Sequence, residues 1–283
     1  MPNSKDVFEE VRNQILIDED QDEIESIAYT LLQQKFGISK SDVVAKTEAP
    51  KINTVLLAQL ISRINKNEPL QYILGEQEFY GRTFKVDPSV LVPRPETELL
   101  VAEVISICQQ NKITNPTILD IGTGSGCIPI TLSLEIECAN TVGTDISRDA
   151  IEVATYNASM HNARSTFVVR DLFVDEFPKS QFNFIVSNPP YITDAEKKGM
   201  KINVTEFEPP QALFVPDDNP LLFYDEIIRQ TVAMAAGRVW IVLEINERFG
   251  KEISAALRLE GFENIKILRD LSNKDRIVSA SLK

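Results

Sequence analysis

Apolar positions in roughly the first 66 residues recur at spacings of three and four, which places them on one face of successive helices. They fall in three groups: Val7, Phe8, Val11 and Ile15; Ile24, Ile27, Ala28, Leu31 and Leu32; and Val55, Leu56, Leu60, Ile61 and Ile64. Breaks at Asp18-Glu19-Asp20, Gly37 and Pro50 divide this part into about four helices, and Pro69 is expected to close the last one. We therefore predict a helical domain over residues 1–74.

After this helical part, apolar residues recur at every second position. Residues 76–80 and 83–86 alternate on either side of Gly81-Arg82, which predicts a β-hairpin. Three prolines then stiffen the chain up to residue 95. We expect residues 75–95 to form a linker that leads into the next domain.

Strands and helices are predicted to alternate through the remainder of the chain, residues 96–283, after a first helix from Glu96 to about Asn111. The strands are Thr117–Ile121, Thr141–Asp145, Thr166–Val169, Phe182–Ser187, Arg238–Ile245, Ile265–Leu268 and Arg276–Ser281. The intervening helices are Ile128–Glu137, Arg148–His161, Leu221–Ala235 and Phe249–Leu259. This is the pattern of a doubly wound α/β domain, and the short connection between the last two strands predicts an antiparallel final strand.

Composition narrows the function. The net charge of −13 argues against a surface that grips nucleic acid, so we expect no direct nucleic-acid binding. No apolar run reaches the roughly 18 residues that a membrane span needs, and the acidic start lacks a signal-peptide pattern, so we expect a cytoplasmic protein. We also expect a monomer. Cys108, Cys127 and Cys138 are interpreted as core residues, and the single His161 as structural or surface-exposed, which leaves no metal site.

A glycine-rich turn follows the first predicted strand of the α/β domain. Gly122-Thr123-Gly124-Ser125-Gly126 leads into a helix, and Asp145 ends the next strand, where its carboxylate can accept from both hydroxyls of a ribose. Asp120, just before the turn, would repel a pyrophosphate but suits a cofactor that carries an amino group and a sulfonium. These residues favour S-adenosylmethionine over NAD. Asp171 and Leu172, after the third strand, are expected at the adenine, although Leu172 also fits an ordinary core position.

The tetrapeptide Asn188-Pro189-Pro190-Tyr191 directly follows the fourth predicted strand. The prolines hold the chain extended and remove backbone donors, so the Asn188 side-chain oxygen and a proline carbonyl can each accept one hydrogen of a planar NH2 group. The Tyr191 ring offers an apolar face to that group. A Pro-Pro turn after a strand is the simpler interpretation of the same residues.

Three longer stretches carry a specific resemblance. They are Pro69-Leu70-Gln71-Tyr72-Ile73-Leu74-Gly75, Glu78-Phe79-Tyr80-Gly81 and Val92-Pro93-Arg94-Pro95-Glu96-Thr97-Glu98. With the glycine turn, Asp145 and the Asn-Pro-Pro-Tyr tetrapeptide, they make the chain resemble the peptide-chain release factor glutamine methyltransferases, which belong to the class I S-adenosylmethionine methyltransferases. The resemblance covers nearly the whole chain.

The resemblance implies a seven-stranded Rossmann-like class I methyltransferase domain with a small N-terminal helical bundle that recognises the substrate. It implies methyl transfer from S-adenosylmethionine, leaving S-adenosylhomocysteine, to the glutamine of the Gly-Gly-Gln loop in class I release factors. It also implies that Gly122–Gly126, Asp145, Leu172 and Asn188 contact the cofactor, and that Asn188–Tyr191 hold the glutamine. Asn246 and the stretch 273–276 depart from the pattern of the family, and we expect both to lie away from the two pockets.

Two other functions fit some of these residues. An adenine-N6 or guanine-N2 nucleic-acid methyltransferase would present the same tetrapeptide to a flipped base, but it would need a basic channel. A nucleotide-binding adaptor would fill the pocket without reaction. The stretch 192–220 lacks periodicity and is interpreted as a lid.

Overall fold

A computed structural model describes residues 2–177 and 182–283. The chain divides into two compact units, the first Met1–Glu76 with Lys201–Phe207 and the second Gln77–Met200 with Glu208–Lys283. Residues 1 and 178–181, which belong to the predicted domains, lie outside the described residues. The domain limits at 74 and 95 stay predictions. No pattern in the sequence indicated that Lys201–Phe207 would group with the N-terminal helices.

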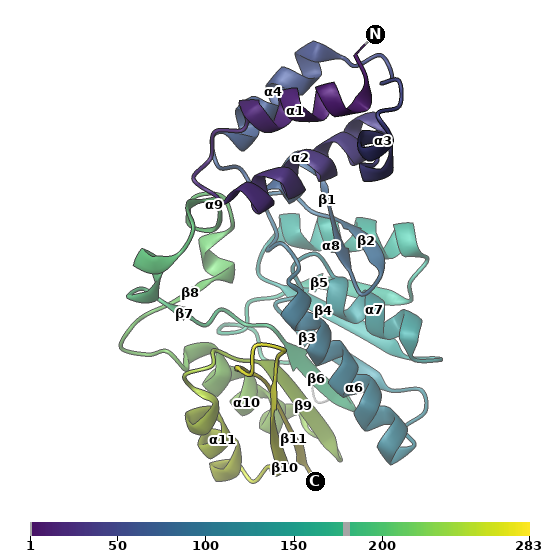
Figure 1. Cartoon of the computed structure of the whole chain (residues 1–283). Helices are drawn as coiled ribbons and strands as arrows, with labels where there is room; N and C mark the ends of the chain where they lie inside the picture. The colour runs from purple at the N-terminus through teal and green to yellow at the C-terminus, as the bar shows by residue number, and fades with distance from the viewer. Residues whose placement is uncertain (1, 178–181) are drawn as a thin grey trace. The chain divides into compact units, whose positions relative to one another are not determined.

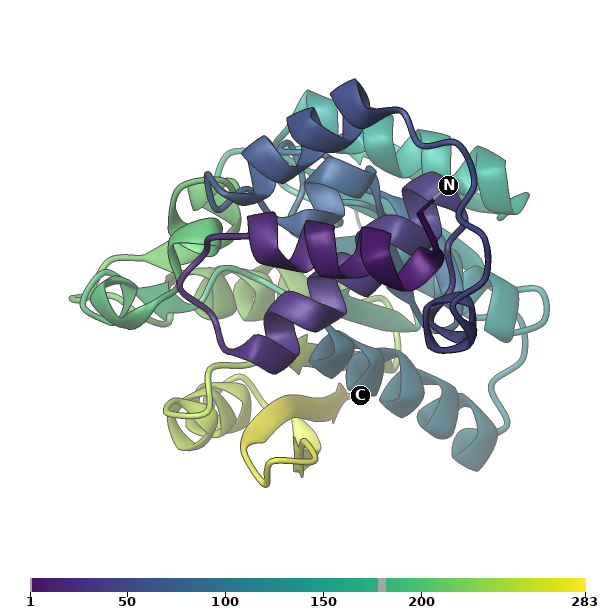
Figure 2. The same ribbon diagram turned by 45° about the horizontal axis from the view of Figure 1, so that its top comes forward.

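The first unit is helical, and its N-terminal helices are coloured purple to blue in Figures 1 and 2, whereas its later segment is green. Its helices are α1 (Ser4–Gln14), α2 (Gln21–Phe36), α3 (Lys40–Ala45), α4 (Thr54–Ile64) and α5 (Leu70–Leu74), with the short α9 (Ile202–Thr205) from the later segment. The apolar positions at spacings of three and four form its core. The prediction for Pro69 is wrong, because α4 already ends at Ile64 and Pro69 lies at the start of α5. Proline is tolerated there because the first helical turn does not use its N–H.

A hairpin opens the second unit, with β1 (Glu76–Phe79) and β2 (Arg82–Lys85). Its turn residues are Tyr80 and Gly81, whose φ angles of 51° and 70° are the left-handed pair that a tight hairpin turn requires, so the predicted turn is one residue too late. Asn157 accepts a hydrogen bond from the N–H of Lys85 at 2.8 Å and donates to its carbonyl at 3.0 Å. The His161 ring pairs with the Thr83 carbonyl at 2.8 Å, which confirms a structural role for this residue.

Seven strands form the central sheet of the second unit, in the order β10-β11-β9-β6-β3-β4-β5. They are β3 (Thr117–Ile121), β4 (Asn140–Asp145), β5 (Ser165–Val169), β6 (Phe184–Ser187), β9 (Val239–Glu244), β10 (Glu263–Arg269) and β11 (Asp275–Leu282). β11 runs antiparallel to both of its neighbours, and the other pairings are parallel, as predicted. The chain moves outward from β3 to β4 and β5 and then returns to β6 on the other side of β3. The direction in which the chain adds strands to the sheet therefore reverses between β3 and β6, although these two strands are parallel.

Helices cover both faces of this sheet (Figure 1). One apolar cluster joins the sheet to α6 (Glu98–Asn111), α7 (Cys127–Glu135) and α8 (Arg148–His161), and a second joins it to α10 (Leu222–Met234) and α11 (Gly250–Leu259). Residues alternate between the two clusters along β6, because successive side chains of a strand point to opposite faces. This arrangement confirms the predicted α/β fold class.

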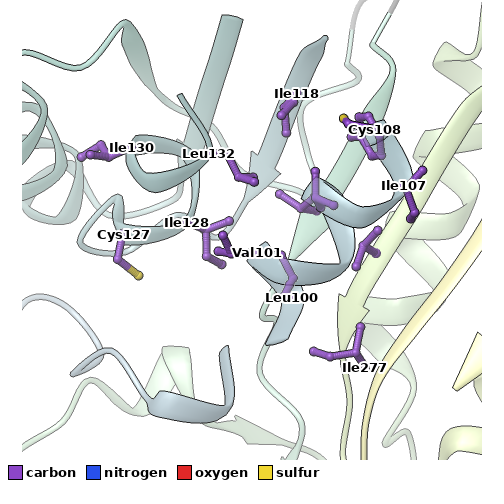
Figure 3. Packing of buried hydrophobic residues seen from close by; sticks show 14 of the residues in the cluster. Leu100, Val101, Ile107, Cys108, Ile118, Cys127, Ile128, Ile130, Leu132 and Ile277 are labelled. Atoms are coloured by element: carbon purple, nitrogen blue, oxygen red, sulfur yellow. The ribbon is translucent and has the colours of Figure 1, made fainter. Parts of the chain in front are cut away.

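The first of these clusters tests the predicted burial of the cysteines (Figure 3). Cys108 and Cys127 are buried in it, as predicted. Cys138 is exposed, so its assignment to the core is wrong. It lies between α7 and β4 with a φ of 57°, in a turn that carries it out of the helix's apolar face.

Gly143 of β4 lies where no side chain fits. A Cβ there would approach both Phe167 Cδ1 and Thr123 Oγ1 to 2.6 Å. We expect Gly143→Ala to lower the free energy of unfolding by about 1–3 kcal/mol, because overpacking a filled core forces its neighbours to move. Thermal unfolding measures the loss. Gly237→Ala is the matched control, since a Cβ at Gly237 meets nothing within 4 Å, and an equal loss in both variants would contradict the steric account.

The stretch 192–220 contains short elements where the sequence showed no period. They are β7 (Ile192–Thr193), the 3-10 helices η2 (Glu196–Gly199) and η3 (Pro210–Ala212), α9, and β8 (Phe214–Val215), which pairs parallel with β7. Its role as a lid stays a prediction. Within residues 2–177 and 182–283, no helix combines the length and apolar character needed to cross a membrane.

Candidate active site

A cleft in the second unit lies at the carboxyl ends of β3, β4, β5 and β6. Ligands of open α/β sheets bind at this edge, where the strand order reverses. The cleft is lined by eight of the residues predicted for the site, Gly122, Gly124, Asp145, Asp171, Leu172, Asn188, Pro189 and Pro190. Thr123, Ser125, Gly126 and Tyr191 are not part of its lining. Their contacts with a ligand stay predictions.

The glycine turn is folded tightly over the end of β4. The N–H groups of Gly122 and Thr123 both donate to the Thr144 carbonyl at 2.8 Å. Gly122, Gly124 and Gly126 have φ angles of 75°, 51° and 78°, a conformation in which only glycine is unstrained. A side chain at Gly126 would also crowd Ala154 and Ile130 at 3.0 Å. Gly122 and Gly124 therefore bring bare backbone to the cleft, and Gly126 lets the turn pack closely against its neighbours.

Asp145 is fixed beside this turn. Its Oδ2 accepts from the N–H of Gly124 and its Oδ1 from the N–H of Ser147, both at 2.9 Å. Burial raises the pKa of Asp145, and these backbone donors oppose the rise. Because a carboxylate has about four acceptor positions, the anchored group still has lone pairs for ligand hydroxyls.

Asp171 and Leu172 line the cleft after β5. The Asp171 Oδ1 accepts a hydrogen bond from the N–H of Phe173 at 2.8 Å, so one of its two oxygens already has a partner within the same loop. Leu172 is 9% exposed, which agrees with its alternative interpretation as a core residue while it still forms part of the wall. Both remain candidates for an adenine contact.

Asp120 is fully buried at the end of β3. Neither of its carboxylate oxygens has a hydrogen-bond partner among the described residues. Burial raises the pKa of Asp120 to about 7, and the negative charge of Asp145 adds to the rise. A buried carboxylate without a partner is costly. Asp120 is not among the residues that line the cleft, so its interaction with a cationic ligand group stays a prediction.

A hydrogen-bond chain holds the tetrapeptide after β6. The Asn188 Nδ2 donates to Thr97 Oγ1 at 3.2 Å, and Thr97 Oγ1 donates to Glu244 Oε2 at 2.6 Å. The Tyr191 hydroxyl donates to the other oxygen of Glu244 at 3.0 Å. Burial raises the pKa of Tyr191, and the negative Glu244 raises it further, so the phenol keeps its proton.

Sequence reasoning did not single out Thr97 or Glu244. Thr97 is 3% exposed at the start of α6, and Glu244 is 1% exposed at the end of β9. One signal was available for the glutamate, because a carboxylate that ends an otherwise apolar parallel strand lies at the edge where ligands bind.

Two loops complete the cleft wall, one contributing Leu91 and the other Pro209, Gln211 and Ala212. They are joined by Arg94, whose Nη2 lies 2.5 Å from Glu208 Oε1, and by the N–H of Val92, which donates to Glu208 Oε2 at 3.3 Å. The Glu208 side chain is 2% exposed and that of Arg94 34%. The predicted linker thus supplies part of the site.

Known proteins were compared with the chain as a whole. The family profile described as "Methyltransferase small domain" matches residues 96–206. A release factor glutamine methyltransferase of Bacteroides thetaiotaomicron is 39% identical over 228 residues, covering 80% of this chain and 80% of that protein. Another, of Flavobacterium psychrophilum, is 35% identical over 268 residues, covering 93% and 94%. The chain belongs to the release factor glutamine methyltransferase family. The resemblance found in the sequence is therefore confirmed.

The fold is shared more widely than this family. The crystal structure of the hMettl16 catalytic domain in complex with the MAT2A 3′UTR hairpin 6 is similar with a TM-score of 0.57, covering 93% of this chain and 82% of that one. Their sequences are only 15% identical, so this likeness concerns the fold alone. The fold alone therefore does not identify a substrate, and specificity depends on the site.

Two residues in the regions that depart from the family pattern lie beside the tetrapeptide, although neither Asn246 nor Arg276 lines the cleft. Asn246, a departure from the pattern expected of release factor glutamine methyltransferases, lies beside the tetrapeptide, and its Nδ2 donates to the Tyr191 carbonyl at 3.2 Å. Arg276, which ends the second departing stretch, faces Tyr191 and Glu244 and lowers the pKa of each. The reason is the sheet register. β6 and β9 are parallel neighbours with Ser187 opposite Leu243, so the residues that follow both strands meet at one edge.

The contact between Arg94 and Glu208 predicts a measurable stability difference. Glu208→Ala should lower the free energy of unfolding by about 2 kcal/mol, less than for a fully buried pair because Arg94 is partly exposed. Denaturant unfolding measures this value. Glu206→Ala removes the same charge from an exposed position and should change stability by less than about 0.5 kcal/mol. Equal values for the two variants would show that the ion pair does not hold the wall.

Proposed function

We propose that this protein transfers a methyl group from S-adenosylmethionine to the side-chain N5 of the glutamine in the Gly-Gly-Gln loop of class I release factors. The observation that carries the proposal is that the glycine turn and the Asn188-Pro189-Pro190 stretch line one and the same cleft. The names of the relatives, release factor glutamine methyltransferases, support the choice of substrate.

The cleft suits a nitrogen that carries two hydrogens. Asn188 and the prolines contribute carbonyl oxygens, and the prolines contribute no N–H. An amide nitrogen is a weak nucleophile because its lone pair is shared with the carbonyl. Acceptors on both N–H bonds strengthen as the nitrogen becomes positive, so they stabilise the transition state more than the bound substrate. No base is needed before attack, since the methylated nitrogen is acidic and loses its proton afterwards.

The residues around the glycine turn fit S-adenosylmethionine. When bound, this cofactor supplies an electrophilic methyl group on a sulfonium. Asp145 is anchored with lone pairs left for ribose hydroxyls, and Asp171 and Leu172 line the cleft for the adenine. The unpartnered Asp120 supports a cationic ligand at the end of β3. By the same proposal, the backbone of residues 122–126 follows the cofactor.

The ionisation of Asp120 makes cofactor affinity depend on pH. A carboxyl with a pKa of about 7 is mostly neutral at pH 6 and mostly charged at pH 8, and the charged form attracts a cation. Titration calorimetry with S-adenosylmethionine should therefore show the affinity ratio of wild type to Asp120→Asn rising about 10-fold from pH 6 to pH 8. Using the ratio cancels the titration of the cofactor's own amino group. A ratio independent of pH would contradict this role.

The cofactor-free protein gives an independent check on Asp120. Because folding raises its pKa, the contribution of Asp120 to stability is greatest below its ordinary pKa of 3.8 and is lost as the pH rises through about 7. Asp120→Asn should thus unfold at a higher temperature than wild type at pH 8 and at nearly the same temperature at pH 5. A lower midpoint for the variant at pH 8 would contradict the shift.

The substrate is tested by offering alternatives together. The protein is incubated with methyl-labelled S-adenosylmethionine and a class I release factor, a release factor whose loop glutamine is alanine, duplex DNA or structured RNA. We expect label only in the intact release factor. Label in nucleic acid would favour adenine-N6 or guanine-N2 methylation, and cofactor binding without any transfer would favour an adaptor. The monomeric state and the cytoplasmic location stay predictions.

A further inference from the structure

The hydrogen-bond chain beneath Asn188 contains two residues that the proposed function does not use. Thr97 and Glu244 are both buried. Among the described residues, Thr97 Oγ1 accepts the hydrogen bond that Asn188 Nδ2 donates, at 3.2 Å. Thr97 comes from the turn before α6 and Glu244 from β9, so distant parts of the second unit meet under this one side chain. Such a contact fixes more than the position of Asn188. It also decides which end of the amide faces the cleft.

Glu244 is an acceptor on both oxygens. Thr97 Oγ1 donates to Oε2 at 2.6 Å, and the Tyr191 hydroxyl donates to Oε1 at 3.0 Å. Burial raises the pKa of Glu244, while these two donors and the guanidinium of Arg276 oppose the rise. Because both Glu244 oxygens accept from hydroxyl groups, the hydroxyl proton of Thr97 is committed to Glu244.

The hydrogen-bonding capacity that remains on the Thr97 hydroxyl determines the orientation of the Asn188 side-chain amide. A hydroxyl has one proton, so the Thr97 oxygen can offer Asn188 only lone pairs. Asn188 must then present its NH2 group to Thr97, and its Oδ1 is turned away from Thr97. If the amide were reversed, two oxygens would face each other without a proton between them. That arrangement loses one hydrogen bond and leaves a buried acceptor pair in repulsion.

We propose that Thr97 and Glu244 are positioning residues that determine specificity, by holding the Asn188 carbonyl oxygen toward the substrate so that the cleft accepts an amide NH2 group and rejects a carboxylate. This inference rests on the proposed function. With the oxygen inward, a glutamine N–H finds an acceptor, whereas a glutamate oxygen would meet another oxygen. A site built around a substrate N–H discriminates strongly against an analogue that lacks it.

Two substitutions at Thr97 separate the hydroxyl from its packing. Thr97→Val removes the hydroxyl at nearly constant volume, so Asn188 Nδ2 loses its hydrogen-bond acceptor. The Asn188 amide can then rotate so that its NH2 group faces the cleft, where it finds other acceptors. We expect kcat on a release factor to fall about 10- to 100-fold, the factor expected for one polar contact of this kind. KM should change less than about 3-fold, because the hydrogen bond to the substrate N–H is expected to strengthen mainly in the transition state. Thr97→Ser keeps the hydroxyl and should retain kcat within about 3-fold.

Binding gives a readout that a merely structural role would not move. Titration calorimetry compares the affinities for a release factor with its natural loop glutamine and for one with glutamate in its place. Wild type and Thr97→Ser should prefer glutamine, and this preference should shrink about 10-fold or more in Thr97→Val. An unchanged preference in Thr97→Val, or an equal loss of kcat in the serine variant, would overturn the inference.

The orientation itself is measured in the wild-type protein, so the inference stays testable even if Thr97→Val unfolds. Nuclear Overhauser contacts should join the side-chain NH2 protons of Asn188 to the Thr97 methyl group. Absence of these contacts in a spectrum that resolves both groups would overturn the orientation. Absence of wild-type turnover on any release factor would overturn the proposed function and this inference together. Turnover with a reversed Asn188 would overturn the inference alone.

Discussion

Asn188→Ala is expected to lower the rate of glutamine methylation by about 10²- to 10³-fold while the protein stays folded. This is the factor typical for removing one group that stabilises developing charge in a transition state. Asn188 lines the cleft and carries the side-chain oxygen that we assign to one N–H of the substrate. Single-turnover methylation of a release factor measures the rate, and the thermal unfolding midpoint reports the fold.

A matched control separates this role from the loss of any asparagine. Asn140 begins β4, at the opposite end of the strand from the cleft, and is exposed. Asn140→Ala should therefore methylate at the wild-type rate. Near wild-type turnover in Asn188→Ala would refute the assignment, and so would a rate loss that merely follows a lowered unfolding midpoint.

Asp145→Ala is expected to weaken binding of S-adenosylhomocysteine by about 100-fold or more, because hydrogen bonds to a charged group contribute about 1.5–3 kcal/mol each. Two ribose hydroxyls would lose their acceptor, and the N–H of Gly124, now bonded to Asp145 at 2.9 Å, would lose its anchor. Calorimetric titration with S-adenosylhomocysteine measures the change without relying on turnover.

Asp149 provides the control for the Asp145 prediction. It is the second residue of α8, is exposed, and carries the same charge. Asp149→Ala should bind S-adenosylhomocysteine within about 2-fold of wild type, because an exposed charge is screened by solvent. A similar loss in both variants would mean that overall charge, and not the anchored carboxylate, governs binding. Full affinity in Asp145→Ala would remove Asp145 from the cofactor site.

The alternation of strands with helices and the direction of the last strand followed from local patterns, whereas the order of the strands in the sheet was not predicted. Strands with period two or continuous apolar runs alternated with helical patterns, and the short connection before β11 required an antiparallel strand. The predicted glycine turn, Asp145 and the tetrapeptide came together at the cleft because the carboxyl ends of parallel strands share one edge. These features depend on residues that are close together in the chain, so the sequence alone is enough to predict them.

Features that depend on distant residues could not be predicted. Thr97 and Glu244 are 147 positions apart in the chain, yet they share a hydrogen bond. The place of Asn246 against Tyr191 depends on which strands are neighbours, and the lack of room at Gly143 depends on Phe167 from the next strand. Each is set by tertiary packing, and neither periodicity nor a motif records it.

The central claim is that this cleft methylates a glutamine side chain. Mass spectrometry of a class I release factor, after incubation with the protein and S-adenosylmethionine, tests it most directly. The account predicts a mass increase of one methyl group, located by fragmentation on the side chain of the loop glutamine and absent when Asn188→Ala replaces the wild type over the same time. An unmodified loop glutamine, or a methyl group on another residue, would contradict the account.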